Sequence, residues 1–431
     1  MGARDITEDP IEATMVAALS QRLRRYWEIG RQMLACGILI PCWLVLIWLF
    51  FKKTSIWIGR LHHLGMTLND PMCIDSQYDF SMFWSVGKMA AAHNYVNIYN
   101  PSTFSLWRHL HLCANAVQLP WINLPPALLP SYAISFLPFK LGLVVWLLSS
   151  IVGTVILLRW AKLSWFVVVA GLLSPAALFC LEKSQFGVMM DVFFIAMLVR
   201  SDDRPRLAGS VLGLLILKPQ AALLAPFILL AKKNWQAIFA AAAMVIFILI
   251  CTIVIFGVPV WQAYWQIGRH VENQVLTANS HTYELFGVSV FWMLRSLGAG
   301  IEISLLLQGV SFCFAAALVW YIWRRVEISR TDRLALTVFL SLLATPYGYT
   351  HDMVGYSVAL ACLAERRGWR IDLLDVLFWL WPIACSIVTK DTGILLTPVV
   401  VGLAIIRTWV RADLGIPRLP LWLTPLSKPA R

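Results

Sequence analysis

Two carboxylates, Asp75 and Asp79, lie four residues apart in a stretch rich in aromatic residues, Asp75-Ser-Gln-Tyr78-Asp79-Phe80. They belong to a polar loop, 52–120, that follows the first long apolar run. Asp79 at a helix start can act as an N-cap, and aromatic residues at helical spacing are typical of a helix at the membrane surface. Neither role excludes a chemical one, so we expect reactive groups in this loop.

A second group of polar residues interrupts apolar runs later in the chain. Lys218-Pro219 separates two such runs, and His351-Asp352 follows a helix-breaking proline and glycine. A charge at the centre of a membrane helix costs roughly 2.5–3.5 kcal/mol, so such residues usually line a cavity. We expect Lys218, His351 and Asp352 to share an aqueous site, in which a phosphate is the natural partner of Lys218. A simple helix break and helix capping are the structural alternatives.

Composition is typical of a polytopic membrane protein. Charged residues make up 13% and hydrophobic residues 59% of the 431 residues, against about 25% charged residues in soluble domains. The 21 tryptophans fit aromatic belts at the membrane interfaces. The net charge of +12 comes from basic residues scattered between apolar runs, which suits loops beside anionic lipid and argues against nucleic acid as a partner.

The apolar runs predict an all-α polytopic membrane protein with about twelve transmembrane helices. Some runs are too short to cross a hydrocarbon core of about 30 Å, which predicts broken helix pairs meeting at a cavity. Residues 122–140 are expected to be re-entrant. The first apolar run begins after Arg31, which favours a retained helix over a cleavable signal peptide. Within a single integral-membrane domain, 1–431, we expect a cytoplasmic amino-terminal segment (1–31), a first extracytoplasmic loop with amphipathic helices (52–120), a second long extracytoplasmic loop (257–300) and a cytoplasmic tail (411–431).

Basic residues predict the orientation, because Lys and Arg mark the cytoplasmic ends of membrane spans. Placing all the basic clusters on one side puts the polar breaks on the other side, together with Asp79. The clusters are Arg159/Lys162, Arg200/Arg204/Arg206, Lys232/Lys233, Arg324/Arg325/Arg330, Arg366/Arg367/Arg370 and Arg407/Arg411.

The sequence gives little support for metal or nucleotide chemistry. It has no clustered His or Cys pattern for a metal and no Gly-rich loop for a nucleotide, so we expect no cofactor. Most of the nine cysteines lie in apolar runs, where a thiol behaves as a small hydrophobic group. Cys73 and Cys113 share the first outside loop and can pair in an oxidising compartment.

In the order of these features, the chain resembles the polytopic GT-C glycosyltransferases, and within them glycosyltransferase family 87, which includes polyprenol-phosphate-mannose-dependent α-1,2-mannosyltransferases. The resemblance rests on Asp79-Phe80 with Tyr99 downstream, Pro125-Pro126, the turn with Gln185, Lys218-Pro219, and Pro346 followed by His351-Asp352. One departure is Ser184, where the family often shows Gly before Gln.

The resemblance implies a sugar transfer from a polyprenyl phosphate to a hydroxyl of a lipid or glycan acceptor. It places the reaction on the extracytoplasmic face of the cell (inner) membrane, with Asp79 as general base. One base is enough, because a phosphate is a good leaving group that needs only cationic or hydrogen-bonding support. The residues then expected to bind substrate are Asp75, Tyr78, Gln185, Lys218, Gln220, Arg269, His351 and Asp352.

The main alternative is a transporter or flippase for an envelope lipid precursor, with Asp79 and Lys218 as charges along the pathway. Many transporters are built from inverted repeats, and no internal repeat is evident in this sequence. A second alternative is a non-catalytic assembly partner, for which the Asp79 carboxylate would be dispensable.

Overall fold

In a computed structural model, the structure describes residues 10–61, 78–112, 119–185, 187–277, 285–325 and 327–414. The regular elements in these ranges are helices, apart from one isolated antiparallel bridge between Gly287 and Tyr349. The prediction of an all-α protein is confirmed. Asp75, Cys73 and Cys113 lie outside the described residues.

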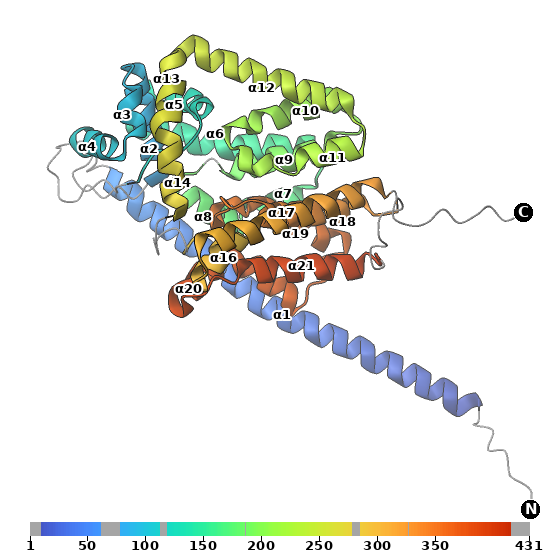
Figure 1. Cartoon of the computed structure of the whole chain (residues 1–431). Coiled ribbons are helices and arrows are strands. Elements are labelled where there is room, and N and C mark those ends of the chain that lie inside the picture. Colours follow the sequence, from blue (N-terminus) through green and yellow to red (C-terminus); the bar gives the residue numbers. More distant parts are fainter. Residues whose placement is uncertain are drawn as a thin grey trace, which may run out of the picture.

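Figure 1 shows the arrangement of the helices along the chain. Those of the first half are α1 (Pro10–Leu61), α2 (Tyr78–Ala91), α3 (Tyr95–Tyr99), α4 (Pro101–His111), η1 (Pro125–Ala127), α5 (Leu128–Ser135), α6 (Phe139–Trp160), α7 (Trp165–Leu172), α8 (Pro175–Glu182), α9 (Gly187–Arg200), α10 (Pro205–Gly213) and η2 (Leu214–Leu217). Those of the second half are η3 (Pro219–Ala222), α11 (Ala225–Ala231), α12 (Trp235–Phe256), α13 (Val258–Ala263), the π-helix η4 (Tyr264–Gly268), α14 (Arg269–Thr277), α16 (Val290–Ser296), α17 (Ile301–Arg324), α18 (Arg330–Ala344), η5 (Thr350–Asp352), α19 (Val354–Arg366), α20 (Leu373–Thr392) and α21 (Thr397–Arg411).

Five of the described helices are long and apolar enough to cross a membrane. These spans are Tyr26–Ser55 within α1, Phe139–Trp160, Trp235–Phe256, Ile301–Arg324 and Leu373–Thr392. The pair α7 and α8, bent by 49° at a short break, adds a sixth if it forms one span. These helices support a multi-pass membrane protein, while the count of about twelve spans and the re-entrant segment 122–140 stay predictions.

Helix α1 is much longer than a bilayer is thick. Its 52 residues extend about 78 Å at about 1.5 Å per residue, and Figure 1 shows it crossing the other helices and projecting beyond them. Where it crosses, the Trp43 indole N–H donates a hydrogen bond of 2.5 Å to the Leu173 carbonyl at the bend between α7 and α8. Because lipid offers no hydrogen-bond partner, this bond satisfies a carbonyl that the bend would otherwise leave exposed.

Helices α2, α3, α4 and α5 form a group at one end of the molecule (Figure 1). Helices α2 and α5 approach so closely that a Cβ at Gly87 would lie 2.0 Å from the Ser131 carbonyl oxygen. Phe80 and Phe83 are buried, with ring centroids 5.9 and 5.0 Å from that of Trp146 on α6. The aromatic face of α2 therefore packs against protein, and not at the lipid headgroups as the helical spacing of its aromatic residues alone suggests.

The basic clusters meet through contacts between different helices. Lys162 and Arg200 both pair with Asp203, and Lys232 pairs with Asp202. Further along, Arg330 lines a cavity of about 520 Å³ together with Lys162, Arg200 and Arg366. Several of the clusters therefore lie close together in the structure, while their placement on the cytoplasmic side stays a prediction.

Candidate functional site

Lys218 and Asp352 form a buried ion pair where two helix breaks meet. Lys218 separates η2 from η3, and Pro219 begins the second of these short helices. Asp352 ends η5, where its carboxylate also accepts a hydrogen bond of 3.1 Å from the Tyr349 backbone N–H. The predicted partner of Lys218 was a phosphate, but in the structure a carboxylate takes that place. The Lys218 charge thus has a partner within the protein and does not need the phosphate to balance it.

A second carboxylate, Asp191 on α9, lies beside this pair. Asp191 is buried, and its Oδ2 accepts a hydrogen bond of 3.0 Å from the Gly355 backbone N–H at the start of α19. Asp191, Lys218 and Asp352 line a cavity of about 30 Å³, to which Gln220 also contributes. That volume is about the share of one water molecule in the liquid, so substrate binding here requires the helix breaks to move apart.

The turn with Gln185 approaches the same cluster from α8. The Gln185 backbone N–H donates a hydrogen bond of 3.0 Å to the Cys180 carbonyl. Cys180 in turn lies near the charged groups of Lys218, Asp191 and Asp352 and interacts with them electrostatically. Ser184, just before it, is buried and has φ of +54°. This left-handed conformation favours glycine, which is a physical reason for the glycine that the resemblance leads one to expect at this position.

Asp79 lies in the first turn of α2 and is partly buried. Its neighbour Phe80 packs on Trp146, whose indole N–H donates a hydrogen bond of 2.9 Å to the Ser184 carbonyl. Arg108 of α4, also buried, donates to the Ser81 hydroxyl at 2.7 Å and so fixes the same turn of α2. A single side chain, Trp146, thus connects the turn that carries Asp79 with the turn that carries Gln185. Tyr78 begins α2, and its side chain lies outside what the structure describes.

The His351 side chain is largely buried, with 18% of its surface exposed, and its Nε2 lies 3.8 Å from Asp352 Oδ1. Its ring stacks on that of Tyr349, with centroids 5.7 Å apart. η5 is outside the helices that could span the membrane. Burial lowers the pKa of His351 to about 4, although the Asp352 carboxylate acts in the opposite direction. The imidazole is therefore neutral at ordinary pH and offers a hydrogen bond instead of a charge.

Arg269 belongs to a different polar group, at the start of α14. It is exposed, with its guanidinium 5.2 Å from the Trp265 ring centroid. One turn further, Glu272 accepts a hydrogen bond of 3.2 Å from Tyr264 and also bonds Tyr347. Burial and the Glu272 carboxylate raise the pKa of Tyr264 to about 12, so Tyr264 stays a donor. Tyr347 lies in the loop that leads to η5. Glu272 therefore links the polar residues around Arg269 to the segment that carries His351.

The structure thus brings together Lys218, Gln220, His351 and Asp352, with Gln185 nearby. Arg269 packs on Trp265 at the start of α14, and Asp79 belongs to α2, so both residues come from helices other than the short ones that carry the cluster. Asp191 and Glu272 were not among the site residues predicted from the sequence. Asp191 is the only charged residue in the apolar run Gly187-Val-Met-Met-Asp191-Val-Phe-Phe. Because a charge in a membrane helix is costly and usually has a function, this position could have been predicted from the sequence. Glu272 has no comparable signal, because its surroundings in the sequence are polar.

Among the described residues, no group of three or more His, Cys, Asp or Glu side chains is arranged to hold a metal ion. The polar side chains described above are carboxylates, a neutral imidazole, a lysine, an arginine and tyrosine hydroxyls. Such groups can move a proton from a hydroxyl and support a departing anion.

The glycosyltransferase family 87 model matches residues 121–346, just over half of the chain. The chain belongs to glycosyltransferase family 87 and is a glycosyltransferase of the membrane. The matched region contains Gln185, Lys218, Gln220 and Arg269, whereas Asp79, His351 and Asp352 lie outside it. Neither the curated proteins nor the solved structures gave a match.

Proposed function

We propose that this glycosyltransferase moves a sugar, mannose or another hexose or pentose, from a polyprenyl-phosphate donor to a hydroxyl of a lipid or glycan acceptor. Asp79 acts as general base: it takes the proton of the acceptor hydroxyl while the oxygen attacks the anomeric carbon and the bond to the lipid phosphate breaks. The observation that carries the proposal is the position of Asp79 on a helix that family-87 residues hold in place through Trp146.

Support for the departing phosphate comes from the other polar residues. The Lys218 charge is already balanced by the Asp352 carboxylate, and Asp191 lies beside this pair. An added anion gains little from such a cluster. We therefore assign Lys218 to positioning the turn that carries His351. The hydrogen-bonding imidazole of His351 and the exposed guanidinium of Arg269 are the phosphate donors in this proposal.

The proposed reaction takes place on the extracytoplasmic face of the inner membrane. The basic clusters meet at another part of the molecule from the Lys218 cluster, and positive residues favour the cytoplasmic side. The lipid tail of the donor would enter between membrane helices, where apolar surface is plentiful.

The test is to incubate the purified full chain with a panel of radiolabelled polyprenyl-phosphate sugars and a membrane lipid extract. A new radiolabelled glycolipid that needs the lipid-linked donor supports the proposal. Transfer from a nucleotide sugar in the absence of lipid donor would contradict it. Movement of intact donor across proteoliposome membranes without any glycolipid product would favour the transporter instead.

A further inference from the structure

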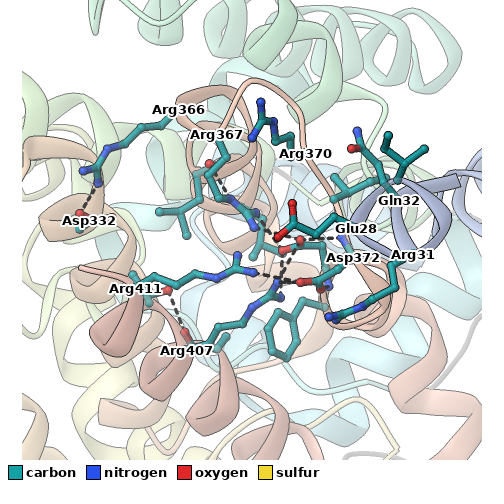
Figure 2. Close-up of a pocket in the computed structure, with 18 residues that line it drawn as sticks. Glu28, Arg31, Gln32, Asp332, Arg366, Arg367, Arg370, Asp372, Arg407 and Arg411 are labelled. Carbon is teal, nitrogen blue, oxygen red and sulfur yellow. Dashed lines mark hydrogen bonds and ion pairs between the residues drawn. The ribbon is translucent and has the colours of Figure 1, made fainter. Parts of the chain in front are cut away.

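A cavity of about 930 Å³ lies among α1, α18, α19, α20 and α21, away from the Lys218 cluster (Figure 2). We call it the arginine cavity. Its cationic lining residues are Arg31, Arg366, Arg367, Arg370, Arg407 and Arg411. Its carboxylates are Glu28, Asp332, Asp372 and Asp375. The formal charge of the lining is therefore positive by two.

The carboxylates of the arginine cavity differ in how many arginines each one pairs with. Arg366 pairs with Asp332, and Arg367 pairs with Asp375 at 2.9 Å. Asp372 is shared between Arg407 at 2.6 Å and Arg411 at 2.9 Å, as Figure 2 shows for the two arginines that extend from α21. Arg407 also pairs with Asp375 at 2.9 Å, so four arginines share three aspartates and leave one excess positive charge. None of the ion pairs among the described residues includes Arg31, Arg370 or Glu28, and these three groups supply the second excess positive charge.

The arginine groups also repel one another. Partial burial and the neighbouring charges of Arg407 and Arg367 lower the pKa of Arg411, which still remains a cation. Burial alone would raise the pKa of Asp372, but the charges of Arg407 and Arg411 lower it. The Asp372 carboxylate therefore stays ionised and paired with both arginines. An additional anion in the cavity would relieve this crowding of positive charge.

The cavity lies where two candidate membrane spans begin. Two of the helices that line it begin membrane spans there: the span of α1 starts at Tyr26, and α20 starts at Leu373. Tyr26 and Trp27 are 71% and 69% exposed, as expected of aromatic residues at the lipid headgroups. Apolar residues such as Ile29 and Leu363 complete the lining and provide contacts for the upper part of acyl chains.

We propose that the arginine cavity binds the phosphate headgroup of an anionic phospholipid, with Arg31 and Arg370 as its main charge partners. Guanidinium groups hold phosphate through paired N–H donors, and basic pockets between membrane helices are suited to anionic headgroups. The shared chemistry is a phosphate ester. The apolar part of the lining and the two candidate membrane spans that begin beside the cavity favour a lipid as its source over a soluble phosphate.

The test uses the purified full chain in neutral detergent micelles and follows its thermal unfolding. Dioleoyl-phosphatidylglycerol should raise the unfolding temperature in a saturable manner, because a ligand of the folded state stabilises it. Dioleoyl-phosphatidylcholine and inorganic pyrophosphate should not. In the double variant R31Q/R370Q, the phosphatidylglycerol concentration for half the effect should increase roughly tenfold or more. Neither substitution strands a carboxylate, so the unliganded unfolding temperature should stay near that of the wild type.

The matched control is R204Q/R206Q, which removes two exposed arginines outside the cavity. This control should respond to phosphatidylglycerol as the wild type does. An equal loss in the control would show a general charge effect and overturn the proposal, as would equal stabilisation by phosphatidylcholine. Stabilisation by pyrophosphate without any by phosphatidylglycerol would assign the cavity to a soluble phosphate and overturn the lipid. If R31Q/R370Q unfolds early without ligand, the single variant R370Q gives the same comparison.

Discussion

Lys218 and Asp352, which are 134 residues apart in the chain, pair with side chains only 9% and 11% exposed. Each stands at a break between helices, so the pair holds two interruptions of the membrane bundle together. Breaking a buried pair by removing one partner costs about 3–5 kcal/mol, because the other charge is left without compensation.

This pair gives a direct test of the positioning role. Lys218→Met alone should strongly reduce both activity and folded protein, since it strands Asp352 beside Asp191. The double variant K218M/D352N should recover much of the folded protein and part of the activity, as measured by detergent-resistant yield and glycolipid formation. If the double variant folds but shows no more donor binding than K218M, then Lys218 contacts the phosphate itself and our assignment is wrong.

Asp79→Asn should abolish turnover while the protein still inserts and accumulates normally. The change is nearly isosteric and removes only the proton acceptor, and a general base is worth about 10²–10⁴ in rate. Asp75→Asn is the matched control and should have a much smaller effect. Comparable rates in the two variants would remove Asp79 from the mechanism.

Ser184 offers a test of backbone conformation without chemistry at the side chain. Ser184→Gly should be tolerated or slightly stabilising, because the residue has φ of +54° and a left-handed conformation costs a residue with a Cβ about 1–2 kcal/mol. Ser184→Val should lower both stability and activity. Thermal unfolding of the two purified variants checks this, and a valine variant as stable as the glycine variant would contradict it.

The topology can be mapped with single cysteines and a membrane-impermeant reagent. Positions Asp79, Lys218, His351 and Lys390 should be accessible from outside, and Arg204, Arg325 and Arg367 from the cytoplasm, because the basic clusters mark the cytoplasmic side. Asp79 labelled from the cytoplasmic side would be incompatible with the proposed mechanism.

The pH dependence of the reaction should show no step from His351 near its usual pKa of about 6.5. Its pKa is lowered to about 4, so protonation begins only well below pH 6 and the imidazole stays neutral above that. His351→Gln keeps a hydrogen-bond donor, so its rate profile between pH 5.5 and 8 should parallel that of the wild type at a lower level. A step near pH 6.5 that disappears in this variant would mean that His351 works as a cation.

The sequence allowed the helix breaks to be predicted but not their partners. Proline after Lys218 and before His351 is a local signal, and both breaks lie where these residues indicate. That Asp352 neutralises Lys218 depends on packing between segments far apart in the chain. The aromatic residues of α2 mark a helical face, yet spacing alone does not tell whether that face meets lipid or, as for Phe80 and Phe83, protein.

The hydrogen bond from Trp43 to the Leu173 carbonyl bears on the order in which α1 and the bent pair α7 and α8 assemble in the membrane. Segments emerge from the ribosome in order, amino terminus first, so α1 is in place before the bend, 130 residues later, is made. A carbonyl facing hydrocarbon without a partner costs several kcal/mol, which makes the bent conformation stable only against a neighbour that is already present. We therefore expect the bent pair to complete its insertion against α1.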